Sequence, residues 1–200
     1  MTFFSSTRRP EVLGPLEADL DRTEQIMGQL ERELDPSTRA ELVSELIRLC
    51  SLIEDTMERS VYELLDDKAP DLASRAYEES TRLRTAMVPL DHRVRHVDAS
   101  DVRRTDPEGF ERELTELRET LMGVRAWEIA ELYPFLTAIA SDERPRVHAK
   151  VASARHHASE HPAPAGPIGR LVHKIGAKMD RYPDTADRDH APPHRNVPLG

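Results

Sequence analysis

Four long stretches of the chain carry apolar residues at the spacing of an α-helix, and this periodicity constrains the fold more than any other feature. Residues three and four positions apart share one face of a helix, so each stretch predicts a helix with one apolar stripe. No stretch shows convincing strand alternation. The four stripes are formed by Leu16, Leu20, Met27, Leu30 and Leu34; by Leu42, Leu46, Leu49, Ile53, Met57, Val61 and Leu64; by Leu72, Ala76, Leu83, Met87, Leu90, Val94 and Val97; and by Phe110, Leu114, Leu117, Leu121, Val124, Leu132 and Phe135.

Proline marks the ends of these stretches. Asp35-Pro36 ends the first, and Asp106-Pro107 precedes the fourth, where proline is tolerated because the first N–H groups of a helix have no partner. Amphipathic helices joined mostly by short connections bury their stripes against one another. The sequence therefore predicts an all-α fold, an antiparallel up-down-up-down four-helix bundle over residues 15–140, after a flexible N-terminus at residues 1–14.

Charge and proline content change near residue 141. Residues 1–140 hold 18 Lys+Arg and 30 Asp+Glu, a net charge of -12, whereas residues 141–200 hold 10 and 7, a net charge of +3. The last sixty residues also carry 8 of the 15 prolines and 7 of the 9 histidines. Because frequent prolines interrupt helices, we predict no second core, but a basic helical extension at residues 141–183 and a disordered tail at residues 184–200.

Composition excludes several classes of function. The net charge of -9 disfavours nucleic acid as a general partner, since phosphate backbones would repel the chain. A single cysteine, Cys50, cannot form an internal disulfide or a Cys-rich zinc site. No run approaches the ~20 apolar residues of a membrane span, and no motif for nucleotide binding or a nucleophile elbow is present. We expect a cytoplasmic protein that is not an enzyme.

Three polar residues interrupt the apolar stripes: Thr23, Ser80 and Glu128. A carboxylate in an apolar seam must be paired, protonated or bound to a cation, because burial of an isolated charge costs several kcal/mol. Glu128 is therefore the candidate metal-binding residue. The other interpretation is that it lies at the edge of its stripe and reaches solvent or an arginine such as Arg82 or Arg84.

Two segments resemble each other at the ends of the second and fourth predicted helices. Val61-Tyr62-Glu63-Leu64-Leu65 aligns with Leu132-Tyr133-Pro134-Phe135-Leu136 at an offset of 71 residues. With a long first helix that opens on Ala18-Asp19 and a Pro-rich basic tail, this order resembles the hemerythrin-like, HHE cation-binding family of four-helix bundles over about residues 15–140. The resemblance implies a non-haem di-iron site made of a His on helix 1, a His-x-x-x-Glu on helix 2, a His on helix 3 and a second His-x-x-x-Glu on helix 4.

When the family's ligand positions are mapped onto this sequence one by one, most of them hold residues that differ from the family's ligands. The six positions fall on Leu20, Ile53, Met57, Ser80, Val124 and Glu128. Iron needs imidazole and carboxylate donors, which only Glu128 still offers. We therefore expect no cofactor, and a hemerythrin-like bundle that has lost its di-iron site and acts as a non-catalytic binding or regulatory protein. The alternative is a protein that binds or senses iron or oxygen through an altered site around Glu128.

Other histidines and the lone thiol are weaker candidates. His92 and His96 share a helix face near Asp91, and His157 and His161 repeat that spacing with His148 and His156 close by, so each group could form a weak metal site or be solvated. Cys50 lies beside the second stripe, where a structural role is expected.

A basic amphipathic helix is predicted at residues 166–181. Its apolar face holds Ile168, Leu171, Val172, Ile175 and Met179. Such a helix can contact an anionic membrane surface weakly, bind a groove on a partner, or fold back on the acidic bundle. The partner predicted from the sequence is an unidentified protein or a second copy of the chain.

Overall fold

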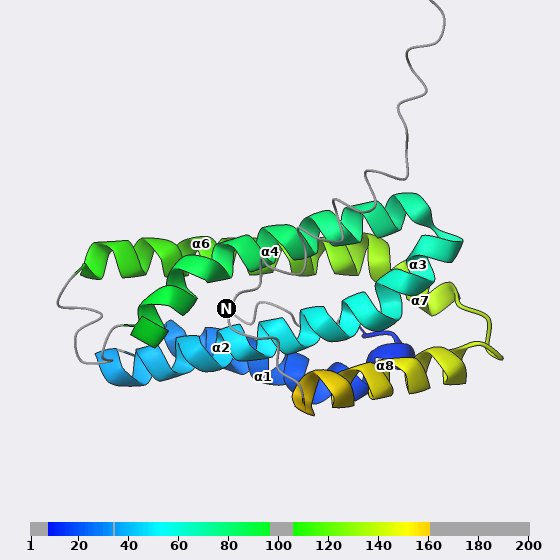
Figure 1. Cartoon of the computed structure of the whole chain (residues 1–200), viewed down its shortest axis with the longest axis horizontal. Coiled ribbons are helices and arrows are strands. Elements are labelled where there is room, and N and C mark those ends of the chain that lie inside the picture. The colour runs from blue at the N-terminus through cyan, green and yellow to red at the C-terminus, as the bar shows by residue number, and fades with distance from the viewer. Residues whose placement is uncertain (1–7, 34, 97–105, 161–200) are drawn as a thin grey trace, which may run out of the picture. The chain divides into compact units, whose positions relative to one another are not determined.

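The computed structural model describes residues 8–33, 35–96 and 106–160. These residues are 90% helical and contain no strand, which confirms the all-α class (Figure 1). Within these ranges no helix combines the length and apolar character needed to cross a membrane. The elements are the 3₁₀ helix η1 (Glu11–Leu16), α1 (Glu17–Leu30), α2 (Pro36–Met57), the π-helical turn η2 (Glu58–Tyr62), α3 (Glu63–Lys68), α4 (Pro70–His96), α6 (Pro107–Trp127), the π-helical turn η3 (Glu128–Leu132), α7 (Tyr133–Ala138) and α8 (Arg144–Glu160).

Helices α2 and α6 begin and continue in the same way. The Asp35 side chain accepts a hydrogen bond from the Thr38 N–H at 2.8 Å, and Asp106 accepts one from the Gly109 N–H at 2.9 Å. Each aspartate caps its helix just before a proline at the first helical position. Both helices then pass into a five-residue π-helical turn, η2 or η3. Such turns occur often at functional sites.

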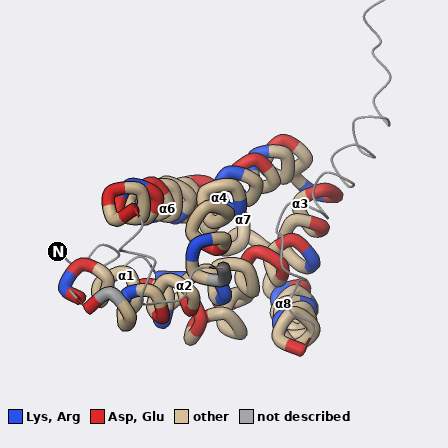
Figure 2. The backbone as a smooth tube through the Cα atoms, turned by 60° about the vertical axis from the view of Figure 1, so that its left-hand side comes forward, with Lys and Arg blue, Asp and Glu red and all other residues tan. Residues whose placement is uncertain are grey.

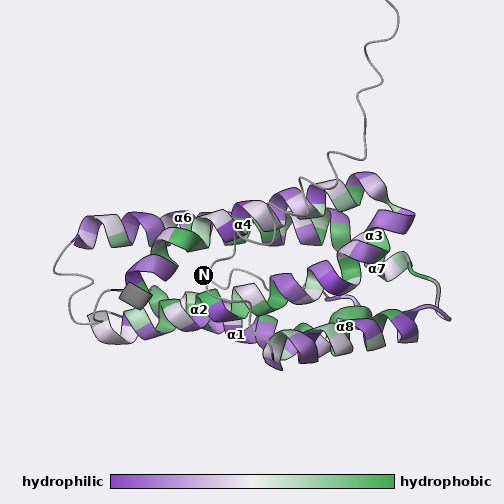
Figure 3. Ribbon diagram, in the orientation of Figure 1, coloured by the Kyte–Doolittle hydropathy of each residue, from purple (hydrophilic) through white to green (hydrophobic). Residues whose placement is uncertain are grey.

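Buried apolar side chains form two clusters, which follow one another along the long helices. In Figure 3 the apolar residues line the inner faces of these helices. The tyrosine cluster comprises Val12, Leu13, Leu16, Leu20, Ile53, Met57, Val61, Tyr62, Leu65, Ala73, Ala76, Trp127, Leu132, Tyr133, Leu136, Ile139, Val147 and Val151. The leucine cluster comprises Ile26, Leu30, Val43, Leu46, Ile47, Leu49, Cys50, Leu83, Ala86, Met87, Leu90, Phe110, Leu114, Leu117, Leu121 and Val124.

Helix α8 belongs to the core, although the sequence places the end of the bundle at residue 140. It packs on η1 and α2, and its Val147 and Val151 are part of the tyrosine cluster. The Arg155 guanidinium also binds the Asp19 carboxylate of α1, with Nε–Oδ2 and Nη2–Oδ1 distances of 2.5 and 3.1 Å. The extension predicted at residues 141–183 therefore starts with a helix that is integral to the packing.

The segment before α1 also differs from the expectation of a flexible N-terminus. Residues 11–14 lie in η1, where Val12 and Leu13 are buried in the tyrosine cluster. They pack against α8, so the two ends of the described chain cover each other's apolar side chains. The basic helix predicted at residues 166–181 and the tail at residues 184–200 lie outside the described residues.

Candidate functional site: a buried polar layer and an adjoining pocket

A layer of polar side chains lies at the boundary between the two apolar clusters. On α1 the tyrosine cluster ends at Leu20 and the leucine cluster begins at Ile26, with Thr23 between them. The same boundary falls at or next to Glu54 on α2, Ser80 on α4 and Glu128 at the start of η3. We call these four residues the polar layer. Their exposed fractions are 2% for Thr23 and Glu54 and 1% for Ser80 and Glu128, so polar groups from four helical segments are buried at one level.

The sequence predicted three members of this layer and missed the fourth. Thr23, Ser80 and Glu128 interrupt the predicted stripes, and all three are buried. Glu54 was missed because it follows the stripe residue Ile53. A second row at helical spacing contains it, formed by Val43, Ile47, Cys50, Glu54, Met57 and Val61, whose other members are all buried.

Glu128 is held by an arginine one turn before it on the same helix. Arg125 Nη1 donates a hydrogen bond to Glu128 Oε2, and the two side chains are 12% and 1% exposed. Burial alone would lower the pKa of Arg125, but the negative charge of Glu128 and its hydrogen bond raise that pKa above the ordinary value. Arg82 and Arg84, the partners suggested by the sequence, instead form ion pairs with Glu79 at 3.7 Å and with Glu58 at 2.9 Å.

Glu54 is buried without an ion pair to any described residue. Its Oε2 atom has no hydrogen-bond partner in the described part of the chain. Burial raises the pKa of this carboxyl, and the charge of Glu128 adds to the increase, while the Ser80 hydroxyl, Arg84 and Arg125 lower it. The net direction is upward, so Glu54 keeps its proton at a pH where an exposed glutamate has lost it.

The six positions that the resemblance assigns to metal ligands do not fit iron. Leu20, Ile53, Met57 and Val124 are 2% to 3% exposed and present only aliphatic or thioether side chains to the core. Ser80 supplies a hydroxyl, and the Glu128 carboxylate is engaged by Arg125. Over residues 8–33, 35–96 and 106–160, no three His, Cys, Asp or Glu side chains come together as a group that could hold a metal ion.

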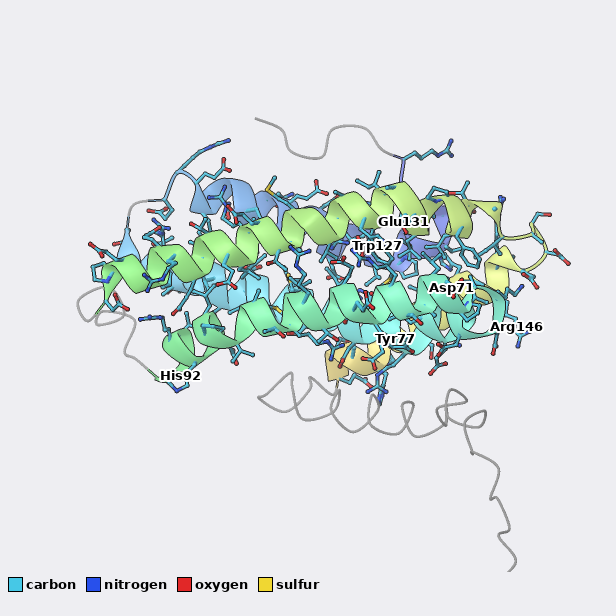
Figure 4. The ribbon with its side chains drawn as sticks, turned by 90° about the horizontal axis from the view of Figure 1, so that it is seen from above. Asp71, Tyr77, His92, Trp127, Glu131 and Arg146 are labelled. Atoms are coloured by element: carbon cyan, nitrogen blue, oxygen red, sulfur yellow. The ribbon has the colours of Figure 1, made fainter. Side chains whose placement is uncertain are left out.

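The weaker candidates lie apart from the layer. Figure 4 shows His92 near the end of α4 opposite to Asp71 and well separated from Trp127. His156 on α8 is exposed and lies 3.3 Å from Glu160, whereas His161 and the side chain of His96 are outside the described residues. Cys50 is buried as predicted, and burial is the main reason that its pKa rises to about 12. A thiol with that pKa is not a nucleophile near neutral pH.

A polar pocket of about 520 Å³ adjoins the layer. Glu17, Leu20 and Asp21 line it from α1, and Arg125, Ile129 and Tyr133 line it from α6, η3 and α7. Arg125 therefore connects the layer and the pocket, because it binds the buried Glu128 and also lines the pocket. The volume is in the range of small-molecule sites. The sequence did not predict this pocket, since it depends on how α1 lies beside the fourth long helical segment.

Comparison of the chain with protein-family models, with curated proteins and with solved structures found no match in any of the three.

Proposed function

We propose that the chain is a hemerythrin-like, antiparallel up-down-up-down four-helix bundle, extended by α8, which has lost its di-iron site and acts as a non-catalytic binding or regulatory protein. One observation carries this proposal. Of the six positions that the resemblance assigns to ligands, four are buried aliphatic or methionine side chains, one is Ser80, and the sixth is Glu128, already paired with Arg125.

Packing energetics support the same proposal. Burial of one Val, Leu, Ile or Met side chain stabilises the folded state by about 1.5–3 kcal/mol. Buried polar ligands without a metal would instead leave polar groups without hydrogen-bond partners, which destabilises the folded state. Apolar filling thus allows the core to fold without a cofactor. We place the protein in the cytoplasm, since a single buried thiol fits a reducing compartment.

The alternative is an altered metal site around Glu128 that binds iron or senses oxygen. The observation that favours it is the proximity of a second buried carboxylate, Glu54, on a facing helix. Two carboxylates without imidazoles make a poor iron site, and the Arg125 guanidinium competes for Glu128. We therefore keep the metal-free function as the proposal.

The unfolding temperature of the full chain is expected to be the same in chelator and in excess Fe²⁺. A metal that binds only the folded state, present at 100 times its dissociation constant, adds about 2.7 kcal/mol of stability. In a chain of this size that corresponds to an increase of about 5–10 °C. Thermal melts followed by far-UV circular dichroism would measure this. A cooperative melt that disappears in chelator would contradict the proposal.

A further inference from the structure

The pocket beside the polar layer carries more negative than positive charge. Four carboxylates line it, those of Glu11, Glu17, Asp21 and Glu24, together with three guanidiniums, those of Arg8, Arg9 and Arg125. The Glu128 carboxylate stands directly behind Arg125 and neutralises it. Five carboxylates therefore face three guanidiniums, which favours a cation over an anion as the occupant.

Some of the charged groups of the pocket form ion pairs with one another and others do not. Arg9 binds two of the carboxylates, with distances of 2.5 Å to Asp21 and 2.6 Å to Glu24. Glu11 and Glu17 are exposed and have no ion pair with another residue that the structure describes. Arg8 also lines the pocket and is exposed. Because five carboxylates stand against three guanidiniums, two negative charges are left for a ligand, and Glu11 and Glu17 are the carboxylates that no described ion pair holds.

A hydroxyl on the wall of the pocket gives a second observation, independent of the charges. Tyr133 lines the pocket and is only 6% exposed, yet its hydroxyl has no hydrogen bond to any described residue. Burial raises the pKa of Tyr133, so the hydroxyl stays neutral and its oxygen can accept a hydrogen bond from an ammonium group. Leu20 and Ile129 add apolar surface next to it.

These features together specify a ligand with a cationic end and an apolar stem. We propose that the pocket binds a small organic cation, an amine or guanidinium on a short apolar chain, with the charge held by Glu17 and the Tyr133 hydroxyl and the stem against Leu20 and Ile129. Such an amphipathic site combines apolar walls with a few polar groups that fix the ligand's orientation. This inference names the ligand class of the proposed binding function and rests on it.

Three probes that share one six-carbon stem test the charge preference: hexylamine, hexan-1-ol and hexanoate. Isothermal titration of the full chain at neutral pH is expected to show saturable binding of hexylamine, with at least about tenfold weaker binding of the other two, the loss typical of a charge-assisted hydrogen bond. Tighter binding of hexanoate, or no binding of any probe, would overturn the proposal.

Matched variants locate the binding. Glu17→Gln is expected to weaken hexylamine binding about tenfold and Tyr133→Phe several-fold, because each removes one acceptor and keeps the side chain's shape. The control is Glu41→Gln, the same charge change at an exposed position on α2 outside the pocket, which should leave the affinity unchanged. Equal weakening by Glu17→Gln and Glu41→Gln would mean diffuse charge attraction and would overturn the assignment.

Iron content measured on the same preparations separates the failure of this proposal from the failure of the proposed function. Bound iron refutes the metal-free function, whereas iron-free protein that does not bind the amine refutes only the ligand class.

Discussion

Replacing Arg125 by leucine is expected to lower the free energy of unfolding by about 3–5 kcal/mol, because it leaves Glu128 buried without a compensating charge. The reverse replacement, Glu128→Leu, should be close to neutral or stabilising. It removes a buried charge, and the Arg125 guanidinium can turn towards the pocket that it already lines. The double variant should recover most of the loss caused by Arg125→Leu alone. Urea unfolding of the parent, the two single variants and the double variant gives the free energies of this double-mutant cycle.

The control for this cycle is Arg118→Leu, the same change on the same helix. Arg118 pairs with Glu31, and the two side chains are 29% and 31% exposed, so their pair should contribute less than about 1 kcal/mol. If Arg125→Leu costs no more than Arg118→Leu, the polar layer does not depend on the Arg125–Glu128 pair.

Glu54→Gln is expected to stabilise the protein above about pH 5, and to leave its stability unchanged in more acidic solution. The folded-state pKa of Glu54 is raised above its unfolded value, so the folded state binds more protons and stability falls as pH rises from the unfolded pKa of about 4.5. Glutamine resembles the protonated acid and removes this loss. The gain at neutral pH should be on the order of 1–3 kcal/mol, the usual cost of an unsatisfied buried polar group.

The pH dependence separates this effect from a change in packing. Unfolding free energies of parent and Glu54→Gln, measured from pH 4 to pH 8, should diverge progressively as pH increases. The exposed Glu41→Gln variant on the same helix should run parallel to the parent. A difference between parent and Glu54→Gln that is constant over the whole range would show that Glu54 does not titrate in the folded state as its burial requires.

The helical class could be read from the sequence because the stripes repeat at helical spacing over long stretches. Helix α8 could not be placed in the same way. Its buried residues are Val147, Val151, Ala154 and Ala158, only two of them large, within a segment whose basic composition suggests an exposed extension. The spacing of four, three and four residues is nevertheless helical, and it is the signal that predicts packing against η1 and α2.

The candidate site was only partly predictable. An interrupted stripe identifies a buried polar residue, as it did for Thr23, Ser80 and Glu128. It does not identify the residue's partner: Arg125 lies outside the stripe of α6, and only the helical turn that joins it to Glu128 brings the two charges together. The pocket was beyond prediction, because it depends on the separation of α1 from η3 and α7, which no local pattern encodes.

Outer surfaces of the helices carry mixed charges in Figure 2. Met122 is the one large apolar side chain of the described residues that is substantially exposed, at 37%. Recognition through a broad apolar face of these helices is therefore not supported, and the pocket is the stronger candidate for binding.

Metal content is the measurement that tests the metal-free core most directly. The full chain, produced without a histidine tag in iron-supplemented medium, is analysed for transition metals by mass spectrometry and for a near-UV charge-transfer band. We predict that iron is far below one atom per chain and that the band is absent. Stoichiometric iron in the parent that is lost in Glu128→Leu would contradict the account and establish an altered metal site around Glu128.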